Sequence, residues 1–328
     1  MSCICVDAMG GDEKPDVVLE GIEAALAAER GLSVIVAGND EVVTPFCAGR
    51  ERARALVTTE VIEMGEHPTE AIRTKKDSSI VRGCAAVRDG EADGFFSAGS
   101  TGAVFAAASL GVGRIAGVKR PCIATALPGA TGRSTVLLDM GANADVRPEM
   151  LVQFAQMGRA YSRVVVGVDD PTVALLSNGS EDTKGSSAVL AAHKALAACG
   201  ESWFVGNCEG TDLLAGRFDV IVTDGFTGNV ALKSLEGTAK FLLGELKSAI
   251  GDSRRAAVGA PMIKPAALKD LSQKLSGDAY GGAILLGLRA PVLIGHGATS
   301  SEAVKNGTLA CARAHDSRLV DRIAAEVA

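Results

Sequence analysis

Six apolar runs in this chain end abruptly at clusters of Gly, Asp, Asn, Ser, Thr or His, and a helical pattern follows. The six segments are 3–12, 95–103, 136–145, 173–185, 219–229 and 292–300. In a parallel sheet the carboxyl ends of the strands lie along one edge, and ligands bind in the crevice there. We therefore expect the six polar loops to face one common space, which is the candidate active site.

Strand and helix patterns alternate along the whole chain. Strands are expected at 3–7, 33–37, 56–63, 93–97, 122–127, 134–139, 172–176, 202–206, 218–223 and 291–295. Helices are expected at 15–29, 40–53, 77–89, 101–112, 148–164, 183–198, 228–249 and 300–326. Such alternation is typical of an α/β fold, with a mostly parallel sheet between two helical layers. No linker-like stretch divides the chain, so we expect a single domain over 1–328.

Residues 228–276 depart from this rhythm because they contain no strand pattern. They predict a helical hairpin that is inserted in the domain and projects from the sheet. Its tip combines the apolar residues Val258, Met262 and Ile263 with nearby cations. Such a tip suits a membrane interface or a dimer contact, and a tip folded back onto the protein fits the composition equally well.

Composition and charge exclude several functional classes. No run of about 18 apolar residues is present and the first strand has no basic flank, so we expect neither a membrane span nor a signal peptide. We therefore expect a cytoplasmic protein whose eight cysteines are reduced. The net charge of −6 disfavours nucleic acid as a partner, because binding to phosphate backbones requires a basic face.

One local stretch is basic, with Arg73, Lys75, Lys76 and Arg82 close together. By spacing alone it predicts a solvated helix start.

Residues 97–102 form a loop of small and polar residues between a strand and a helix. Gly99 and Gly102 let the backbone approach a ligand, and Ser100 and Thr101 add hydroxyl donors at the helix start, where the dipole favours an anion. The loop therefore favours phosphate binding over a simple helix cap. It matches neither the dinucleotide fingerprint nor the P-loop.

The loop 139–145 offers the oxygens of Asp139, Asn143 and Asp145. It fails the calcium-loop pattern, in which Gly is sixth and Glu is twelfth, because Ala144 and Met150 occupy those positions. No Cys/His cluster has zinc-site spacing either. We expect no bound metal.

Two more strand-end loops carry candidate catalytic groups. Lys184 lies in a helix start, where a cation is slightly disfavoured unless an anion offsets it; a surface lysine is the alternative. Asn229 can hold a carbonyl oxygen as negative charge develops, or it caps the helix that follows. His296 follows the last strand in a structural or a catalytic role. No serine or cysteine nucleophile signature is present, so we expect the substrate to bring the nucleophile.

Nine strings in order along the chain resemble the PlsX family of phosphate acyltransferases of bacterial phospholipid synthesis. The strings are 7–12, 75–79, 97–103, 139–145, 175–179 with 184–185, 206–210, 224–229, 281–283 with 285–287, and 296–297. Two departures are visible. Ala298-Thr299 replaces a pair usually written Ser-Ser, and Ser180 stands where the family often has Glu.

The resemblance implies transfer of a long-chain acyl group from acyl carrier protein to inorganic phosphate, without a cofactor. It implies a fold like that of phosphate acetyltransferases and isocitrate or isopropylmalate dehydrogenases. It also implies a homodimer that associates peripherally with the membrane, where the downstream glycerol-3-phosphate acyltransferase is an expected partner. The acidic carrier protein would give the basic stretch 73–82 a use.

Carried onto this chain, the family's active-site lysine and asparagine fall on Lys184 and Asn229. We assign Lys184 to the phosphate or the oxyanion and Asn229 to the carbonyl oxygen. Phosphate and substrate binding is expected from Asp7, Gly10, Gly11, Gly99, Ser100, Thr101, Gly102, Asp139, Asn143, Asp145, Asp224 and His296. The alternatives are a short-chain phosphotransacetylase that uses coenzyme A and a non-enzymatic membrane scaffold.

Overall fold

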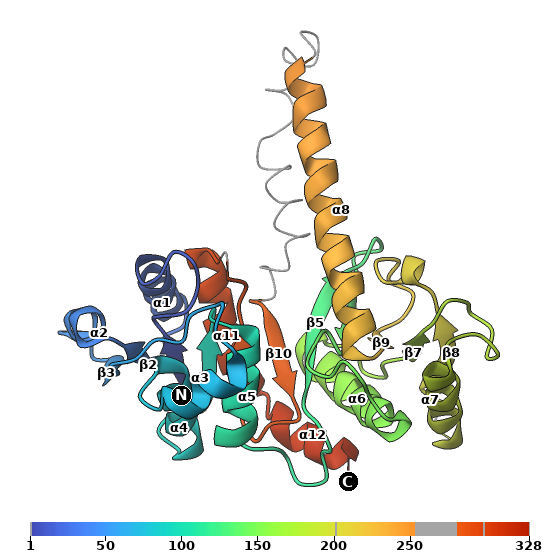
Figure 1. The fold of residues 1–328 in the computed structure, drawn as a ribbon, viewed down its shortest axis with the longest axis horizontal. Helices are drawn as coiled ribbons and strands as arrows, with labels where there is room; N and C mark the ends of the chain where they lie inside the picture. Colours follow the sequence, from blue (N-terminus) through green and yellow to red (C-terminus); the bar gives the residue numbers. More distant parts are fainter. Residues whose placement is uncertain (1, 201, 253–280, 298, 328) are drawn as a thin grey trace.

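A computed structural model describes residues 2–200, 202–252, 281–297 and 299–327 (Figure 1). The predicted membrane-contact residues Val258, Met262 and Ile263 lie outside the described residues. The second half of the predicted hairpin 228–276 does too, so both stay predictions. None of the described helices has the length and hydropathy that crossing a membrane requires.

The described residues form strands and helices in alternation. The strands are β1 (Ser2–Asp7), β2 (Leu32–Gly38), β3 (Ala53–Val57), β4 (Gly94–Ser97), β5 (Cys122–Pro128), β6 (Ser134–Leu138), β7 (Val173–Leu176), β8 (Phe204–Cys208), β9 (Val220–Val222), β10 (Ala283–Leu286) and β11 (Val292–Ile294). The α-helices are α1 (Asp16–Ala28), α2 (Asp40–Cys47), α3 (Pro68–Thr74), α4 (Ser79–Arg88), α5 (Thr101–Gly111), α6 (Pro148–Tyr161), α7 (Ser187–Ala198), α8 (Gly225–Asp252), α11 (Ser301–Asp316) and α12 (Leu319–Val327). A short π-helix (Ser162–Val166) extends α6, and a 3-10 turn (Gly210–Asp212) follows β8.

All the strands belong to one sheet, in the order β3-β2-β1-β4-β11-β10-β5-β6-β9-β7-β8. The strands β3, β2, β1, β4 and β11 are mutually parallel, and so are β6, β9, β7 and β8. Antiparallel pairs join the two groups through β10 and β5. The groups therefore run in opposite directions, and the expectation that all six polar loops lie on one edge is wrong for this sheet.

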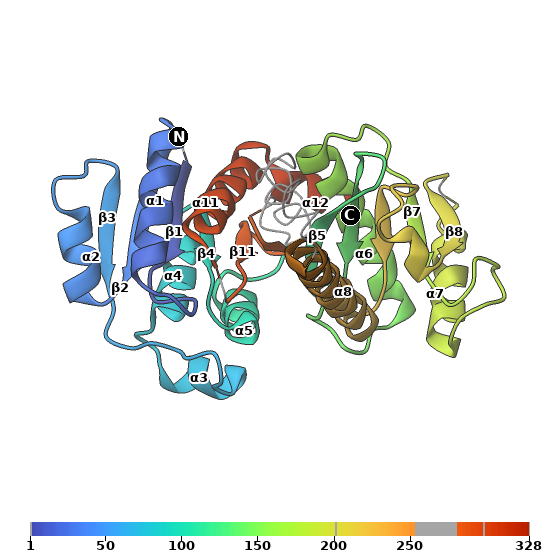
Figure 2. The same cartoon turned by 90° about the horizontal axis from the view of Figure 1, so that it is seen from above.

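Helices cover both faces of the sheet (Figure 2). Apolar residues of α1, α2, α6, α7, α11 and α12 share one buried cluster with the strands, and those of α3, α4 and α5 share the other. Along β1, Ile4 and Val6 enter the first cluster and Cys5 the second, as the period of a strand requires. The expected α/β fold, with helices on both faces of a mostly parallel sheet, is confirmed.

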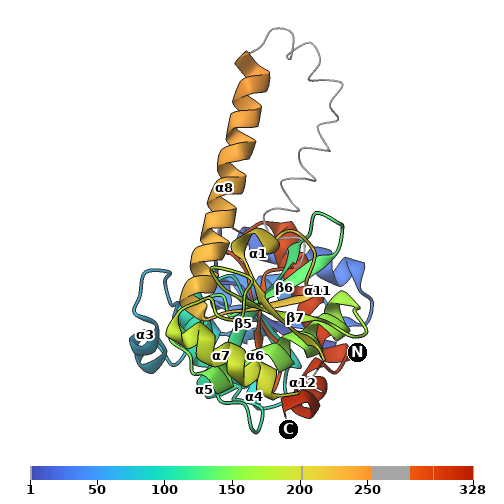
Figure 3. The same cartoon turned by 90° about the vertical axis from the view of Figure 1, so that its right-hand side faces the viewer.

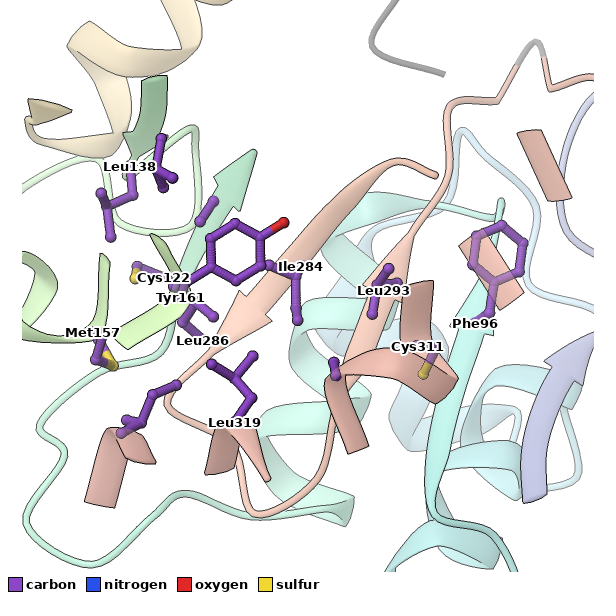
Figure 4. Close-up of a cluster of buried hydrophobic side chains, with 14 of the residues drawn as sticks. Phe96, Cys122, Leu138, Met157, Tyr161, Ile284, Leu286, Leu293, Cys311 and Leu319 are labelled. Carbon is purple, nitrogen blue, oxygen red and sulfur yellow. The ribbon is translucent and has the colours of Figure 1, made fainter. Parts of the chain in front are cut away.

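The two groups of strands share a continuous apolar core (Figure 4). It draws on β4, β5, β6, β10 and β11 of the sheet and on α6, α11 and α12 of one helical layer. The residues labelled there are Phe96, Cys122, Leu138, Met157, Tyr161, Ile284, Leu286, Leu293, Cys311 and Leu319. Because this core continues across the antiparallel strands, it fixes one group of strands against the other.

Several elements differ from the predicted ones. The strand expected at 56–63 is β3, which ends at Val57, because Asp77 accepts a hydrogen bond from Thr59 N (3.0 Å) and Lys75 Nζ donates to Val61 O (2.7 Å). These bonds tie residues 59–61 to the turn before α4. The helix expected at 300–326 is divided into α11 and α12 at Arg318, whose φ of 55° is left-handed. Helix α3 and strand β10 were not predicted.

Helix α8 stands out from the rest of the molecule (Figures 1 and 3). Its 28 residues span about 42 Å at about 1.5 Å per residue. Its first part packs on the sheet through Leu232 and Leu235. Further along, Phe241 is 64 % exposed and Leu242 59 % exposed. The helix expected at 228–249 is therefore present as α8, and the hairpin stays a prediction.

Candidate active site

A cavity of about 560 Å³ lies between α8 and the sheet, within the size range of small-molecule sites. Five of the six polar loops contribute to it, through Asp12, Thr101, Met140, Asn229 and His296. Its apolar wall includes Ile123, Leu127, Met140, Leu214, Leu232, Leu235, Ala239, Leu242, Ala283 and Ile294, and Lys233 and Glu236 also line the cavity.

Twist within the sheet explains how loops from oppositely directed strands meet at one cavity. Neighbouring strands rotate by roughly 20–25°. From β4 the path to β9 crosses β11, β10, β5 and β6, which makes five steps and a turn of roughly 100–125°. The carboxyl ends of β4 and β9 therefore no longer point in opposite directions, and Thr101 and Asn229 line the same space.

Three of the loops are locked together at glycines. A Cβ at Gly10 would lie 2.6 Å from Gly99 N, so only glycine allows the β1 loop to approach the β4 loop. Gly11 has a φ of +96°, which favours glycine, and the next amide, Asp12 N, donates to Gly297 O (2.9 Å). The loops after β1, β4 and β11 therefore form one rigid part of the cavity rim.

Asp7 supports this rim from inside the protein. Its carboxylate is 1 % exposed and accepts hydrogen bonds from Ser97 Oγ (2.7 Å) and Met9 N (2.9 Å). Ser97 Oγ in turn accepts a hydrogen bond from Gly99 N (3.0 Å). Burial raises the pKa of Asp7, and the hydrogen bonds from Ser79, Ser97 and Met9 oppose that rise. These contacts give Asp7 a supporting role in place of the substrate contact expected from the sequence.

The β4 loop offers donors to the cavity at the start of α5. Thr101 is exposed and lines the cavity. Ser100 is the N-cap residue, yet its side chain makes no capping hydrogen bond. A Cβ at Gly102 would lie 2.6 Å from Pro68 Cγ, which is how α3 packs on this helix start. The helix N-terminus therefore places the Thr101 hydroxyl, a donor that suits an anion, at the cavity, whereas Ser100 is buried and does not line it.

The loop after β6 is held by a buried carboxylate. Asp139 is fully buried, and burial raises the pKa of its carboxyl. The hydrogen bonds that it accepts from Ile123, Ala142 and Asn143 oppose that rise. The Asn143 side chain also donates to Pro121 O (2.8 Å). Asp145 is exposed and does not line the cavity. None of the three acidic or amide side chains predicted here lines the cavity; Met140 and Ile123 do.

The start of α8 places Asn229 in the cavity wall. Asp224 caps the helix, accepting Thr227 N (2.7 Å) and Thr227 Oγ1 (2.8 Å), so its carboxylate has a structural partner. Asn229 is exposed and lines the cavity. A Cβ at Gly141 would lie 3.6 Å from the Asn229 side chain. The amide of Asn229 therefore lies beside the β6 loop and faces open space, as the proposed contact with a carbonyl oxygen requires.

Lys184 follows β7, the strand next to β9, but it does not line the cavity. It is exposed, and its amide donates to Glu181 O (3.0 Å). Asn207 Nδ2 donates to the same carbonyl (2.8 Å), and His193 Nδ1 lies 2.9 Å from Asn207 Oδ1. The Lys184 loop is thus anchored to β8 and α7, beside the strand that leads to Asn229.

The basic stretch is divided between structural and exposed cations. Lys75 pairs with Glu66 (2.6 Å), and Arg82 pairs with Asp77. Arg73 and Lys76 are exposed, although Lys76 Nζ also donates to Ile72 O (3.1 Å). In this basic stretch Arg73 and Lys76 are therefore exposed, and the Arg82 side chain, which is 42 % exposed, pairs with Asp77.

The apolar wall was missed at the sequence level, although α8 carries its signal. Leu232, Leu235, Ala239 and Leu242 recur at spacings of three and four, which places them on one side of a helix. Most of the rest of the wall comes from β5, β10 and β11, whose side chains alternate between the two faces of the sheet. Only the pairing of these strands shows which face lines the cavity.

Comparison with known proteins assigns the chain to a family. The fatty acid synthesis protein family matches residues 3–322. A phosphate acyltransferase from Limosilactobacillus reuteri (strain DSM 20016) is 46 % identical over 308 residues, 92 % of this chain and 90 % of that protein. One from Pelotomaculum thermopropionicum is 46 % identical over 329 residues, 99 % of this chain and 94 % of that protein. The chain belongs to the phosphate acyltransferase family.

Solved structures show that this phosphate acyltransferase family member shares a fold with phosphotransacetylases. One from Streptococcus pyogenes aligns with a TM-score of 0.62 and 17 % identity, covering 98 % of this chain and 94 % of that one. EutD phosphotransacetylase from Staphylococcus aureus aligns with a TM-score of 0.59 and 19 % identity, covering 96 % and 94 %. At these identities the likeness concerns the fold alone.

Proposed function

We propose that this protein transfers a long-chain acyl group from an acyl-carrier-protein thioester to inorganic phosphate, which yields acyl phosphate for glycerophospholipid synthesis. The observation that carries the proposal is the shape of the cavity. It begins at Asn229 and follows α8 to Leu242, thirteen residues or about 20 Å along the helix axis. Polar strand-end residues and a long apolar wall thus belong to one site, as an anion and a fatty chain require.

The reaction needs positioning and charge stabilisation more than a protein nucleophile. A phosphate oxygen attacks the thioester carbon and forms the new C–O bond. The C–S bond then breaks, and its electron pair leaves on sulfur as a thiolate. Donors that hold the carbonyl oxygen stabilise the charge that develops there. We assign that task to Asn229, and binding of phosphate to Lys184 with the start of α5.

The apolar wall favours a long acyl chain over acetyl. Each methylene that enters such a site contributes about 0.8 kcal/mol, a gain that an acetyl group forgoes. A phosphotransacetylase that uses coenzyme A is therefore the less favoured function, and it rests on the fold alone.

The test measures release of carrier thiol with and without phosphate. We expect release from a long-chain acyl carrier protein to require phosphate, and acetyl-CoA to be a poor substrate. Thiol release that does not depend on phosphate would exclude the reaction. Turnover of acetyl-CoA that equals or exceeds turnover of the long-chain substrate would favour the coenzyme A alternative.

Exposed cations near the cavity fit an acidic carrier protein. Helix α3 packs on the start of α5, so Arg73 lies on the helix that flanks the cavity rim. We expect the double variant Arg73→Glu/Lys76→Glu to raise KM for the carrier substrate by roughly tenfold at low salt and by less at high salt. Arg313→Glu/Arg322→Glu, at two exposed residues on the opposite helical layer, makes the same change in charge, is the matched control and should leave KM unchanged.

For a short acyl thioester without the carrier protein, KM should be the same in the Arg73→Glu/Lys76→Glu variant as in the wild type. If KM for the carrier substrate is the same in both variants, the carrier protein docks elsewhere.

Oligomeric state and location are further parts of the proposal. We propose a homodimer that associates peripherally with the membrane and hands its product to a membrane-bound glycerol-3-phosphate acyltransferase. The exposed apolar residues Phe226, Phe241, Leu242 and Leu246 on α8 support a partner surface on this helix.

A further inference from the structure

Both oxygens of the Asp139 carboxylate accept hydrogen bonds inside the protein. Its Oδ1 accepts hydrogen bonds from Ile123 N (3.0 Å) and Ala142 N (3.1 Å). Its Oδ2 accepts from Asn143 N and Asn143 Nδ2, both at 2.8 Å. Four donors occupy the carboxylate and none of its surface is exposed, so it cannot contact phosphate or thioester.

The backbone that the Asp139 carboxylate holds in place also contacts the first turn of α8. Asn143 O accepts the hydrogen bond of Gly225 N (2.8 Å). A Cβ at Gly225 would lie 2.6 Å from Asn143 O, and one at Gly228 would lie 1.9 Å from Asp139 O. The first turn of α8 therefore rests directly on the backbone of residues 139–143, and Asn229 follows in the next position.

We propose that Asp139 is a positioning residue for Asn229, acting through the Asn143 main chain. The inference rests on the role proposed above for Asn229. The carboxylate ties the 139–143 loop to β5 and sets its shape, the loop seats the start of α8, and the helix start aims the Asn229 amide. Displacement of that amide weakens a contact needed only as charge develops, so it lowers kcat more than it raises either KM.

Asp139→Asn is the informative variant. It preserves size but replaces one acceptor oxygen by a donor NH₂, which faces two of the four N–H donors. Asp219→Asn is the matched control. Asp219 is also a buried carboxylate and accepts from Arg133 Nη2 (2.7 Å) and Thr172 N (3.0 Å), but it precedes β9 and lies at the far end of that strand from Asn229.

A double-mutant cycle with Asn229→Ala tests the link. We expect Asp139→Asn to lower kcat by at least about tenfold in the wild-type background and to have little further effect in the Asn229→Ala background. Asp219→Asn should lower the thermal midpoint without lowering kcat at a temperature where it is folded. Asp139→Asn and Asn229→Ala effects that multiply would overturn the inference, as would an Asp139→Asn effect confined to KM for the acyl substrate.

Hydrogen exchange gives a readout that does not depend on activity. Asp139→Asn should speed amide exchange at residues 223–229 relative to the wild type, and Asp219→Asn should not. Unchanged exchange at the start of α8 in Asp139→Asn would contradict the positioning role even if activity falls. If the wild type itself releases no thiol with phosphate, the proposed function fails, and the exchange comparison still decides whether Asp139 positions this helix start.

Discussion

Asn229→Ala should lower kcat for phosphate-dependent thiol release by about 10²–10³-fold, the cost of removing one oxyanion donor. The reason is geometric: Asn229 lies in the cavity wall at the start of α8, and its amide can donate to the carbonyl oxygen of a thioester. The matched control is Ser234→Ala, an exposed residue of the same helix outside the cavity lining, which should retain full kcat.

Lys184→Ala completes this test of the site. Removal of a cation that binds phosphate should raise KM for phosphate, and kcat should fall as well if that cation also contacts the oxyanion. Lys194→Ala, an exposed lysine on α7, is its control. Wild-type activity in both Asn229→Ala and Lys184→Ala would remove the site assignment. If activity falls in only one of the two variants, the residue whose substitution has no effect has no catalytic or binding role.

Ala239→Trp should shorten the cavity and change the acyl-chain preference. Ala239 lies in the apolar wall, ten residues or about 15 Å along α8 from Asn229. If the indole displaces about four methylenes, a long chain loses about 3 kcal/mol. That corresponds to a fall of roughly a hundredfold in kcat/KM. A chain short enough to end before residue 239 should keep its wild-type rate.

The measurement is kcat/KM for a series of acyl carrier substrates of increasing length. Lys240→Trp adds the same side chain at the next position, which is exposed and does not line the cavity, so its chain-length profile should match the wild type. A profile that is identical in Ala239→Trp and Lys240→Trp would place the acyl chain somewhere other than along α8.

Much of the fold could be predicted because local patterns carry it. The alternation of apolar runs and amphipathic stretches predicted most strands and helices, and the glycine-rich ends of the runs predicted where the chain turns. Strand β10 was missed because a short apolar run after Gly282 has no length to distinguish it from loop. Helix α3 was missed because its seven residues give too few turns for a periodic signal.

The expectation of a common edge failed for a different reason. Strand direction is not encoded in any single strand: whether β10, β5 and β6 pair in parallel or antiparallel fashion depends on the connections between them. Those pairs reverse the second group of strands, and a space shared by Thr101 and Asn229 then arises from sheet twist.

The six polar strand ends show how the two kinds of information divide. The sequence by itself determined that strand-end loops carry the chemistry, because glycine, small hydroxyls and amides at those positions follow from local backbone and hydrogen-bonding requirements. Only the tertiary structure decided which side chains face the cavity. Asp7 and Asp139 have the same chemistry as an exposed acid, and burial with satisfied hydrogen bonds makes them supports. The apolar wall was likewise decided by packing, because α8, β5, β10 and β11 come together only when the chain is folded.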